Sequence, residues 1–341
     1  PEGGLKYTYQ YDDLHRMSQI TVFEYDLLKH ETQGIREQHS YTYDGFGQLV
    51  REDSKVLDIW SKSTIYTYDS RGNILEIAIY PYMMIESSLV ISKKVFYYES
   101  SWKDQITAIW HYQQTNLEKI DYYSYDEIGN ILSITSGDQH FTWEGIRLST
   151  HTIDGITYQY LYNDQGVRTS VSDGNHTTTY FVDGYQVLAE QTGNEAIYYT
   201  YNADGTLFSI KTSMGEYFYI SNIQGDVIEL VDIQGNIAAK YVYDAWGNHQ
   251  VLNPDGTINQ STSFIGNINP YRYRSYRYDV KTGLYYLNAR YYDPEIGRFI
   301  SADDVSYLDT STGSAFNLYV YALNNPVMYA GLQAHDSSHV Y

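Results

Sequence analysis

The chain has 341 residues, of which 43% are hydrophobic, and it carries a formal net charge of −20 at pH 7. That charge disfavours nonspecific binding to nucleic acid or to anionic membrane surfaces, because such binding needs clustered lysine and arginine. The absence of cysteine excludes disulfides, thiolate nucleophiles and cysteine-bound metals. No apolar run reaches the length of about 18 residues that would predict a membrane span.

Tyrosine dominates the aromatic composition, with 41 Tyr against 10 Phe and 5 Trp. A tyrosine ring is apolar and its tip is polar, so the residue suits half-buried strands in which one end stays in contact with water. Only 6 Pro and 25 Gly argue against a disordered or collagen-like chain. The composition therefore predicts an all-β protein.

A repeated motif runs along residues 7–250. It reads aromatic–x–aromatic, then Asp or Asn, then a short turn with glycine, then an alternating apolar strand. Aromatic residues two positions apart share one face of a strand, the Asp or Asn bonds its own turn, and glycine supplies the positive φ of a tight hairpin. Each copy predicts a β-hairpin, and because a lone hairpin is marginal in water, neighbouring copies should join one stacked sheet. The copies begin at Tyr9, Tyr41, Tyr66, Tyr123, Tyr160, Tyr199, Tyr217 and Tyr241.

Two segments depart from the motif. Residues 85–96 are largely apolar and β-branched and are predicted to form a strand, whereas residues 101–118 are the least strand-like and predict a helix or loop excursion. Amphipathic helices of about 12 or more residues are not expected. The sequences Asp183-Gly, Asp232-Ile-Gln-Gly-Asn and Asn253-Pro-Asp-Gly predict hairpin turns in preference to calcium loops. The ten histidines lack metal-ligand spacing, so we predict no metal and no cofactor.

A cluster of basic residues lies near the carboxy terminus, within residues 272–298. One interpretation is solubility and salt bridging at strand edges, and the other is an arginine positioned within a site. The cluster comprises Arg272, Arg274, Arg277, Lys281, Arg290 and Arg298.

The repeats resemble the YD repeats of Rhs proteins, teneurins and the C components of Tc toxin complexes. That resemblance implies that the stacked hairpins form a long sheet that spirals into a cocoon-like β-shell. Residues 271–329 also resemble the Rhs-associated core, which plugs the shell in that family. The resemblance implies a shell at 1–265, a core at 266–329 and a tail at the toxin junction at 330–341. The core signature in this chain includes Tyr291, Tyr292, Asp293, Pro294, Gly297, Arg298 and Phe299, followed by Asn317-Leu-Tyr319 and Asn324-Asn325-Pro326-Val327.

In the family, the core often acts as an intramolecular aspartyl protease that cuts just beyond itself. Such chemistry needs two close carboxylates whose pKa values are pushed apart, with a cation nearby. Carried over to this sequence, the resemblance implies Arg290 and Asp303 as catalytic residues, with Asp304 as a candidate substitute carboxylate.

The family's second catalytic aspartate is missing, since the Asp-Pro element expected between Ala330 and Gly331 is absent. Deliberate inactivation, natural loss of the protease and residues missing from the sequence are three open explanations. We therefore expect an inactive autoprotease.

These observations predict the carboxy-terminal shell and core module of a secreted or cell-surface bacterial toxin. Its partner would be a C-terminal toxin segment, held as intramolecular cargo. The alternative is a cell-surface adhesion or carbohydrate-binding protein that presents exposed aromatic side chains to a target-cell surface or glycan, because aromatic rings on a sheet can stack on sugars.

Overall fold

The computed structural model describes residues 3–56, 60–303 and 317–330. The described chain forms two compact units, one with residues up to 124 together with 303–330, and the other with residues 125–302. We call them unit 1 and unit 2. Both consist mainly of antiparallel strands, and the predicted all-β fold of stacked hairpins is confirmed.

In unit 1, each strand pairs antiparallel with the next strand along the chain. Two short 3₁₀ turns accompany these strands, η1 (Ser87–Leu89) and η6 (Ala322–Asn324). The strands are β1 (Gly3–Tyr11), β2 (Met17–Asp26), β3 (Glu31–Tyr43), β4 (Leu49–Val56), β5 (Lys62–Tyr68), β6 (Ile74–Pro81), β7 (Ser92–Tyr97), β8 (Ala108–Gln113) and β9 (Asn116–Tyr125).

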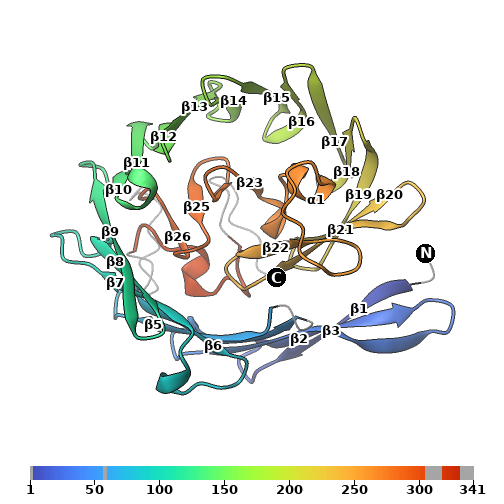
Figure 1. The fold of residues 1–341 in the computed structure, drawn as a ribbon, viewed down its shortest axis with the longest axis horizontal. Helices are drawn as coiled ribbons and strands as arrows, with labels where there is room; N and C mark the ends of the chain where they lie inside the picture. Colours follow the sequence, from blue (N-terminus) through green and yellow to red (C-terminus); the bar gives the residue numbers. More distant parts are fainter. Residues whose placement is uncertain (1–2, 57–59, 304–316, 331–341) are drawn as a thin grey trace. The chain divides into compact units, whose positions relative to one another are not determined.

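Unit 2 continues the same pattern and ends in a small second sheet formed by β23–β26. In Figure 1, β10–β22 follow one another in chain order from green to gold, and the orange and red carboxy-terminal strands lie on one side of them. The elements are β10 (Ile131–Ile134), η2 (Ser136–Asp138), β11 (Gln139–Glu144), β12 (Arg147–Ile153), β13 (Ile156–Tyr162), β14 (Arg168–Ser172), β15 (Thr177–Asp183), β16 (Gln186–Thr192), β17 (Glu195–Tyr201), β18 (Leu207–Thr212), β19 (Gly215–Ser221), β20 (Val227–Asp232), β21 (Ile237–Tyr243), β22 (His249–Leu252), α1 (Ile265–Ile268), η3 (Tyr273–Ser275), β23 (Arg277–Asp279), β24 (Leu284–Tyr286), β25 (Tyr291–Asp293) and β26 (Arg298–Phe299).

The acidic residue of the repeat motif closes its own turn. Asp69 Oδ1 accepts hydrogen bonds from the backbone N–H of Arg71 at 2.8 Å and of Asn73 at 2.9 Å. Its Oδ2 accepts a third bond from Asn73 Nδ2 at 2.8 Å. This confirms the predicted role of the Asp, because each bond satisfies a donor that the tight turn leaves without a ladder partner. The same arrangement recurs at Asp44, Asp126, Asp232 and Asp244.

The second aromatic residue of the motif links one repeat to the preceding one. Tyr43 Oη donates to the carbonyl oxygen of Met17 at 2.6 Å, and Tyr68 Oη donates to that of Leu49 at 2.6 Å. A tyrosine is needed here because phenylalanine would fill the same space but leave the carbonyl without this donor. Equivalent hydroxyl donors are Tyr98, Tyr162, Tyr201 and Tyr243, and the Trp143 indole N–H donates in the same way.

The core of unit 2 lies on one face of its large sheet, where the first aromatic residue of several motifs is buried. The α1 turn and Tyr271 of the following segment pack against that face. The carboxy-terminal segment therefore completes a core that the repeats begin. Its buried residues include Tyr180, Tyr199, Ile210, Tyr219, Leu230, Ala239, Tyr241, Val251, Ile265 and Tyr271.

Two local predictions in unit 1 are confirmed only in part: residues 101–107 form the predicted loop and residues 92–96 lie in the predicted strand, but the rest of each segment differs. Within residues 85–96 only the part from Ser92 onward is a strand, because the chain turns after Pro81 and Met83 N–H bonds to Ser63 Oγ at 2.8 Å. Within residues 101–118 a strand begins at Ala108, where burial of Ile109 favours the sheet.

Long amphipathic helices are absent from the described residues, as predicted. None of the described helices has the length and apolarity needed to cross a membrane.

Candidate functional site

The carboxy-terminal part of unit 2, residues 270–302, docks on the turns of its repeats, and we call it the core segment. Arg274 Nη1 lies 3.2 Å from Asp226 Oδ2 and also donates to the Gln224 carbonyl at 3.1 Å. The Arg274 backbone N–H donates to Asp226 Oδ1 at 2.8 Å, and Ser275 Oγ donates to the Gly225 carbonyl at 2.9 Å. The acidic group at the end of this turn is therefore used twice, by a backbone donor and by a guanidinium.

A second turn, at residues 244–248, accepts three tyrosine hydroxyls from the core segment. Tyr273 donates to the Ala245 carbonyl at 2.8 Å, Tyr292 to the Trp246 carbonyl at 2.7 Å and Tyr285 to the Gly247 carbonyl at 2.9 Å. Three consecutive carbonyls of this turn thus each accept a hydroxyl from the core segment. Gly247 has a φ of +92°, and a Cβ there would lie 2.7 Å from the Tyr273 ring, so only glycine permits this approach.

The most deeply buried charge in unit 2 is Arg168, at the start of β14. Its guanidinium forms a two-pronged ion pair with Asp279 of the core segment, at 2.5 Å (Nη1–Oδ2) and 2.8 Å (Nη2–Oδ1). Arg168 is 1% exposed. Burial alone would lower the pKa of this arginine, but Asp279 and the surrounding tyrosines outweigh it, so the pKa lies well above its ordinary value. The guanidinium carbon lies 4.5–5.8 Å from the ring centres of Tyr160, Tyr180, Tyr286 and Tyr291.

A second buried pair joins Arg277 of the core segment to Glu190 on β16. The Arg277 guanidinium lies 4.4 Å from the Tyr180 ring centre and 5.8 Å from that of Tyr271. Tyr180 therefore contacts both buried arginines, which couples the two pairs through one aromatic ring. Removing one partner of such a pair should destabilise the fold strongly, because the remaining charge is then buried without compensation.

Arg272 of the core segment contacts His249 on β22 through Nη1 and Nε2. A guanidinium has only donors, so Nε2 of the imidazole must be the acceptor and the ring is neutral, with its proton on Nδ1. Tyr285 Oη lies 3.2 Å from that Nδ1. Burial, assisted by Arg272, lowers the pKa of His249 to about 3.

The basic cluster therefore has a different role from solubility at strand edges. Arg272, Arg274 and Arg277 are all less than 10% exposed, so that interpretation is wrong for them, while the predicted salt bridging is confirmed at Arg274 and Arg277. Arg298 is also buried. The sequence analysis missed the partners Glu190 and Asp279. Both are charged residues within strands that otherwise alternate apolar and polar side chains, and this placement could have indicated a buried ion pair.

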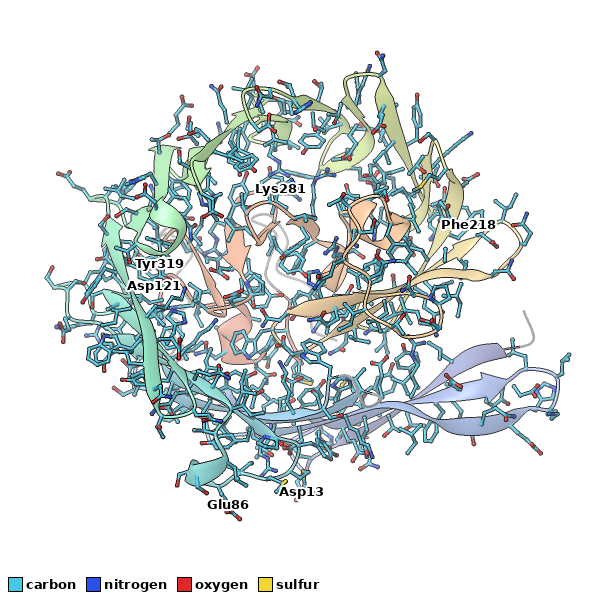
Figure 2. The ribbon with its side chains drawn as sticks, in the orientation of Figure 1. Asp13, Glu86, Asp121, Phe218, Lys281 and Tyr319 are labelled. Carbon is cyan, nitrogen blue, oxygen red and sulfur yellow. The ribbon has the colours of Figure 1, made fainter. Side chains whose placement is uncertain are left out.

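In unit 1, asparagines of the carboxy-terminal segment contact repeat turns in a comparable way. Asn324 Nδ2 donates to the Gly72 carbonyl at 2.7 Å, and Asn325 Nδ2 donates to the Gly47 carbonyl at 2.9 Å. Asn317 Nδ2 donates to Asn73 Oδ1 at 2.8 Å. Tyr319, two residues after Asn317 and labelled in Figure 2, packs in the same unit, since its ring centre lies 5.9 Å from that of Trp102. The Asn-Leu-Tyr and Asn-Asn-Pro-Val elements therefore bind turn carbonyls.

The predicted catalytic residues lie in three different settings. Arg290 is in unit 2, with its guanidinium carbon 3.6 Å from the centre of the Phe299 ring. Asp303 is in unit 1, and its backbone N–H donates to the Leu318 carbonyl at 2.9 Å. Asp304 lies outside the described residues. The catalytic assignment of all three stays a prediction.

The remaining signature residues form the small sheet of unit 2. Tyr292 pairs with Phe299 and Asp293 pairs with Arg298 across β25 and β26. Asp293 Oδ1 accepts the Glu295 N–H at 2.9 Å, which is the bond of a turn residue. Tyr291 faces Arg168, while the Pro294 carbonyl accepts a hydrogen bond from Asn248 Nδ2 and Gly297 follows with a φ of +66°.

In unit 1, the side chains of a serine, a histidine and a glutamate lie next to one another in a row that resembles a catalytic triad. Ser54 Oγ lies 2.9 Å from His39 Nδ1, and His39 Nε2 lies 3.5 Å from Glu37 Oε2. However, the Ser54 hydroxyl donates to Glu52 Oε1 at 3.0 Å, so His39 cannot be the base that takes its proton. Ser54 is also 2% exposed, which excludes a substrate. The arrangement is a structural polar cluster.

Comparison with known families identifies this architecture. The teneurin YD-shell family model matches residues 2–327. The chain belongs to this YD-shell family. The resemblance to Rhs and YD-repeat proteins is thereby confirmed.

The relatives of this chain include a tRNA nuclease and a teneurin. The tRNA3(Ser)-specific nuclease WapA of Bacillus spizizenii is 33% identical over 297 residues, covering 84% of this chain and 11% of that protein. Human Teneurin-4 is 25% identical over 94% of this chain and 10% of its own length. The chain thus spans about a tenth of these relatives.

Solved structures show the same fold. The crystal structure of TcdB2-TccC3-Cdc42 matches with a TM-score of 0.60 and 17% identity, covering 96% of this chain and 18% of the other. At that identity the match establishes the fold alone.

Proposed function

We propose that this YD-shell chain is the shell and core module of a bacterial Rhs-type toxin, in which it encloses or presents a C-terminal toxin segment. The observation that carries the proposal is the docking of residues 270–302 on the repeats, through buried ion pairs with strands β14 and β16 and with the turn at Asp226, and through tyrosine hydroxyls on the turn at 244–248. A segment held in this way gives whatever follows it a fixed point of attachment. The tRNA-nuclease activity named for the WapA relative supports the presence of a destructive cargo in this chain too.

The organisation we propose has a repeat shell at 1–265, a core at 266–329 and a junction with the toxin at 330–341. The carboxy-terminal segments of both units contact repeat turns, which supports treating residues from about 266 onward as one functional element. A secreted or cell-surface location fits a protein whose cargo acts on another cell.

The core is further proposed to be an aspartyl autoprotease that no longer cuts. Arg290 and Asp303 would be its remaining catalytic residues, and the second Asp-Pro is absent after Ala330. A single carboxylate cannot hold a proton and activate water at the same time, so the dyad chemistry fails without its partner.

Two measurements on the protein expressed with its native downstream sequence test the proposal. The first is the intact mass of the wild type and of Asp303→Asn. We expect both to stay whole, whereas cleavage of the wild type alone would show a working protease and overturn the inactive assignment.

The second measurement is limited proteolysis of the downstream segment. The wild type should protect it, and a variant with Arg274→Ala and Arg277→Ala should expose it. Lys211→Ala, which removes an exposed cation, is the control and should behave as the wild type does. Equal digestion of the downstream segment in all three proteins would contradict the enclosing role.

A further inference from the structure

The outward face of β7, β8 and β9 in unit 1 carries a row of aromatic rings. The strand register pairs Val95 with Trp110 and Lys93 with Tyr112, so these side chains share one face of the sheet. The opposite face carries the buried Ile109 and its partner Asp121, which is labelled in Figure 2. Three rings therefore stand on the face that the interior of unit 1 does not use.

Trp110 is the centre of this row. Its ring centre lies 5.1 Å from that of Tyr97, with an interplanar angle of 44°, and 6.5 Å from that of Tyr112, with an angle of 36°. All three side chains are half-buried, so their edges are fixed by neighbours while part of each ring meets water. We call Tyr97, Trp110 and Tyr112 the aromatic platform.

An ion pair between a lysine and a glutamate lies at the edge of the platform. Lys93 Nζ lies 5.0 Å from the Tyr112 ring centre and 3.6 Å from Glu76 Oε2. The Lys93 side chain is 33% exposed and that of Glu76 is 35% exposed, so both remain accessible. The pair offers a donor and an acceptor beside the rings without adding net charge.

These rings differ from the tyrosines that hold the repeats together. Tyr98, the next residue after Tyr97, donates its hydroxyl to the Ile74 carbonyl at 2.8 Å. Among the described residues, Tyr97, Trp110 and Tyr112 give no side-chain hydrogen bond to the protein, and their contacts are with other rings and with Lys93. Their polar tips are therefore available to a ligand.

We propose that the aromatic platform binds a neutral oligosaccharide. A sugar ring has an apolar face of C–H groups, which packs on an aromatic ring, and hydroxyls at its edge that need donors and acceptors. The indole N–H of Trp110 and the Lys93–Glu76 pair supply them. The net charge of −20 disfavours a polyanionic glycan, and Lys93 already occupies the position over Tyr112 that a cationic ligand would take.

The test uses the full chain and an immobilised panel of neutral oligosaccharides of glucose, mannose and N-acetylglucosamine, with sialylated glycans as the acidic comparison. Titration of any retained sugar then gives its affinity for the wild type and for Trp110→Ala, Lys93→Ala and Tyr198→Ala. Tyr198 is an exposed tyrosine on β17 and serves as the matched control. Circular dichroism establishes that each variant is folded, and Trp110→Phe keeps a ring if Trp110→Ala does not fold.

The expected result is binding of a neutral sugar that weakens at least tenfold in Trp110→Ala, weakens less in Lys93→Ala and is unchanged in Tyr198→Ala. Trp110→Phe keeps a ring but loses the indole N–H, so it should weaken binding, though less than Trp110→Ala does. Retention of sialylated glycans only, no retention of any sugar, or equal affinity in Trp110→Ala and the wild type would overturn the proposal.

Discussion

Replacing Arg168 by methionine should destabilise unit 2 strongly. The change keeps much of the side-chain volume but leaves the Asp279 carboxylate, whose side chain is 15% exposed, without its cation. Breaking one partner of a buried ion pair costs about 3–5 kcal/mol. Contacts of the guanidinium with the surrounding tyrosine rings add about 0.5–2 kcal/mol when such contacts are desolvated. We therefore expect a loss of about 4 kcal/mol in the free energy of unfolding.

Urea unfolding followed by circular dichroism and tryptophan fluorescence measures this loss. Arg168→Met combined with Asp279→Leu should recover at least half of it, because removing both charges also removes the cost of burying them. Lys29→Met is the control, since Lys29 pairs with Asp26 at 3.3 Å but is 68% exposed, and Asp26 keeps its bonds from the backbone N–H of Leu28 and residue 29, so the change should cost only about 1 kcal/mol or less. The reasoning is refuted if Arg168→Met costs no more than the control, or if the double variant recovers nothing.

Three further changes probe the turns and the docking contacts by urea unfolding. Tyr43→Phe removes an inter-repeat hydrogen bond and should cost about 1 kcal/mol; a stabilising effect would contradict the role given to the hydroxyl. Gly247→Ala should cost clearly more than Gly47→Ala, because both have positive φ but only Gly247 would place a Cβ against Tyr273; equal costs would argue against the close approach. Burial and a neighbouring arginine hold the pKa of His249 at about 3, so unfolding takes up a proton and stability should fall as pH drops from about 6.5 toward 3. His249→Gln should make that fall shallower, and an unchanged slope would exclude His249 as a cause.

The repeat architecture was predictable because its determinants are local. Asp69 and Gly72 lie within one turn, and the alternation after them fixes the strand that follows. The hydrogen bond from Tyr43 to the Met17 carbonyl was not predictable in the same way, since it joins residues 26 positions apart. The Tyr-x-Tyr pattern indicated a shared face but not the acceptor.

The docking of the core segment depends on pairings across long stretches of sequence. Arg277 meets Glu190 and Arg168 meets Asp279, at separations of 87 and 111 residues. No spacing rule connects such residues, so the basic cluster could be seen in the sequence while its acidic partners could not. The bounds of the core stay a prediction from the family signature, and the functions of Arg290 and Asp303 depend on chemistry that only an assay can show.

Hydrogen–deuterium exchange of the full chain is the most direct test of the central claim, that the turns and strands of the repeats hold the core segment in place. Amides of residues 284–299 should exchange as slowly as those of β20 and β21, and Arg277→Ala should accelerate them while leaving the repeat strands protected. Fast exchange of residues 284–299 in the wild type, with the repeat strands still protected, would contradict the claim.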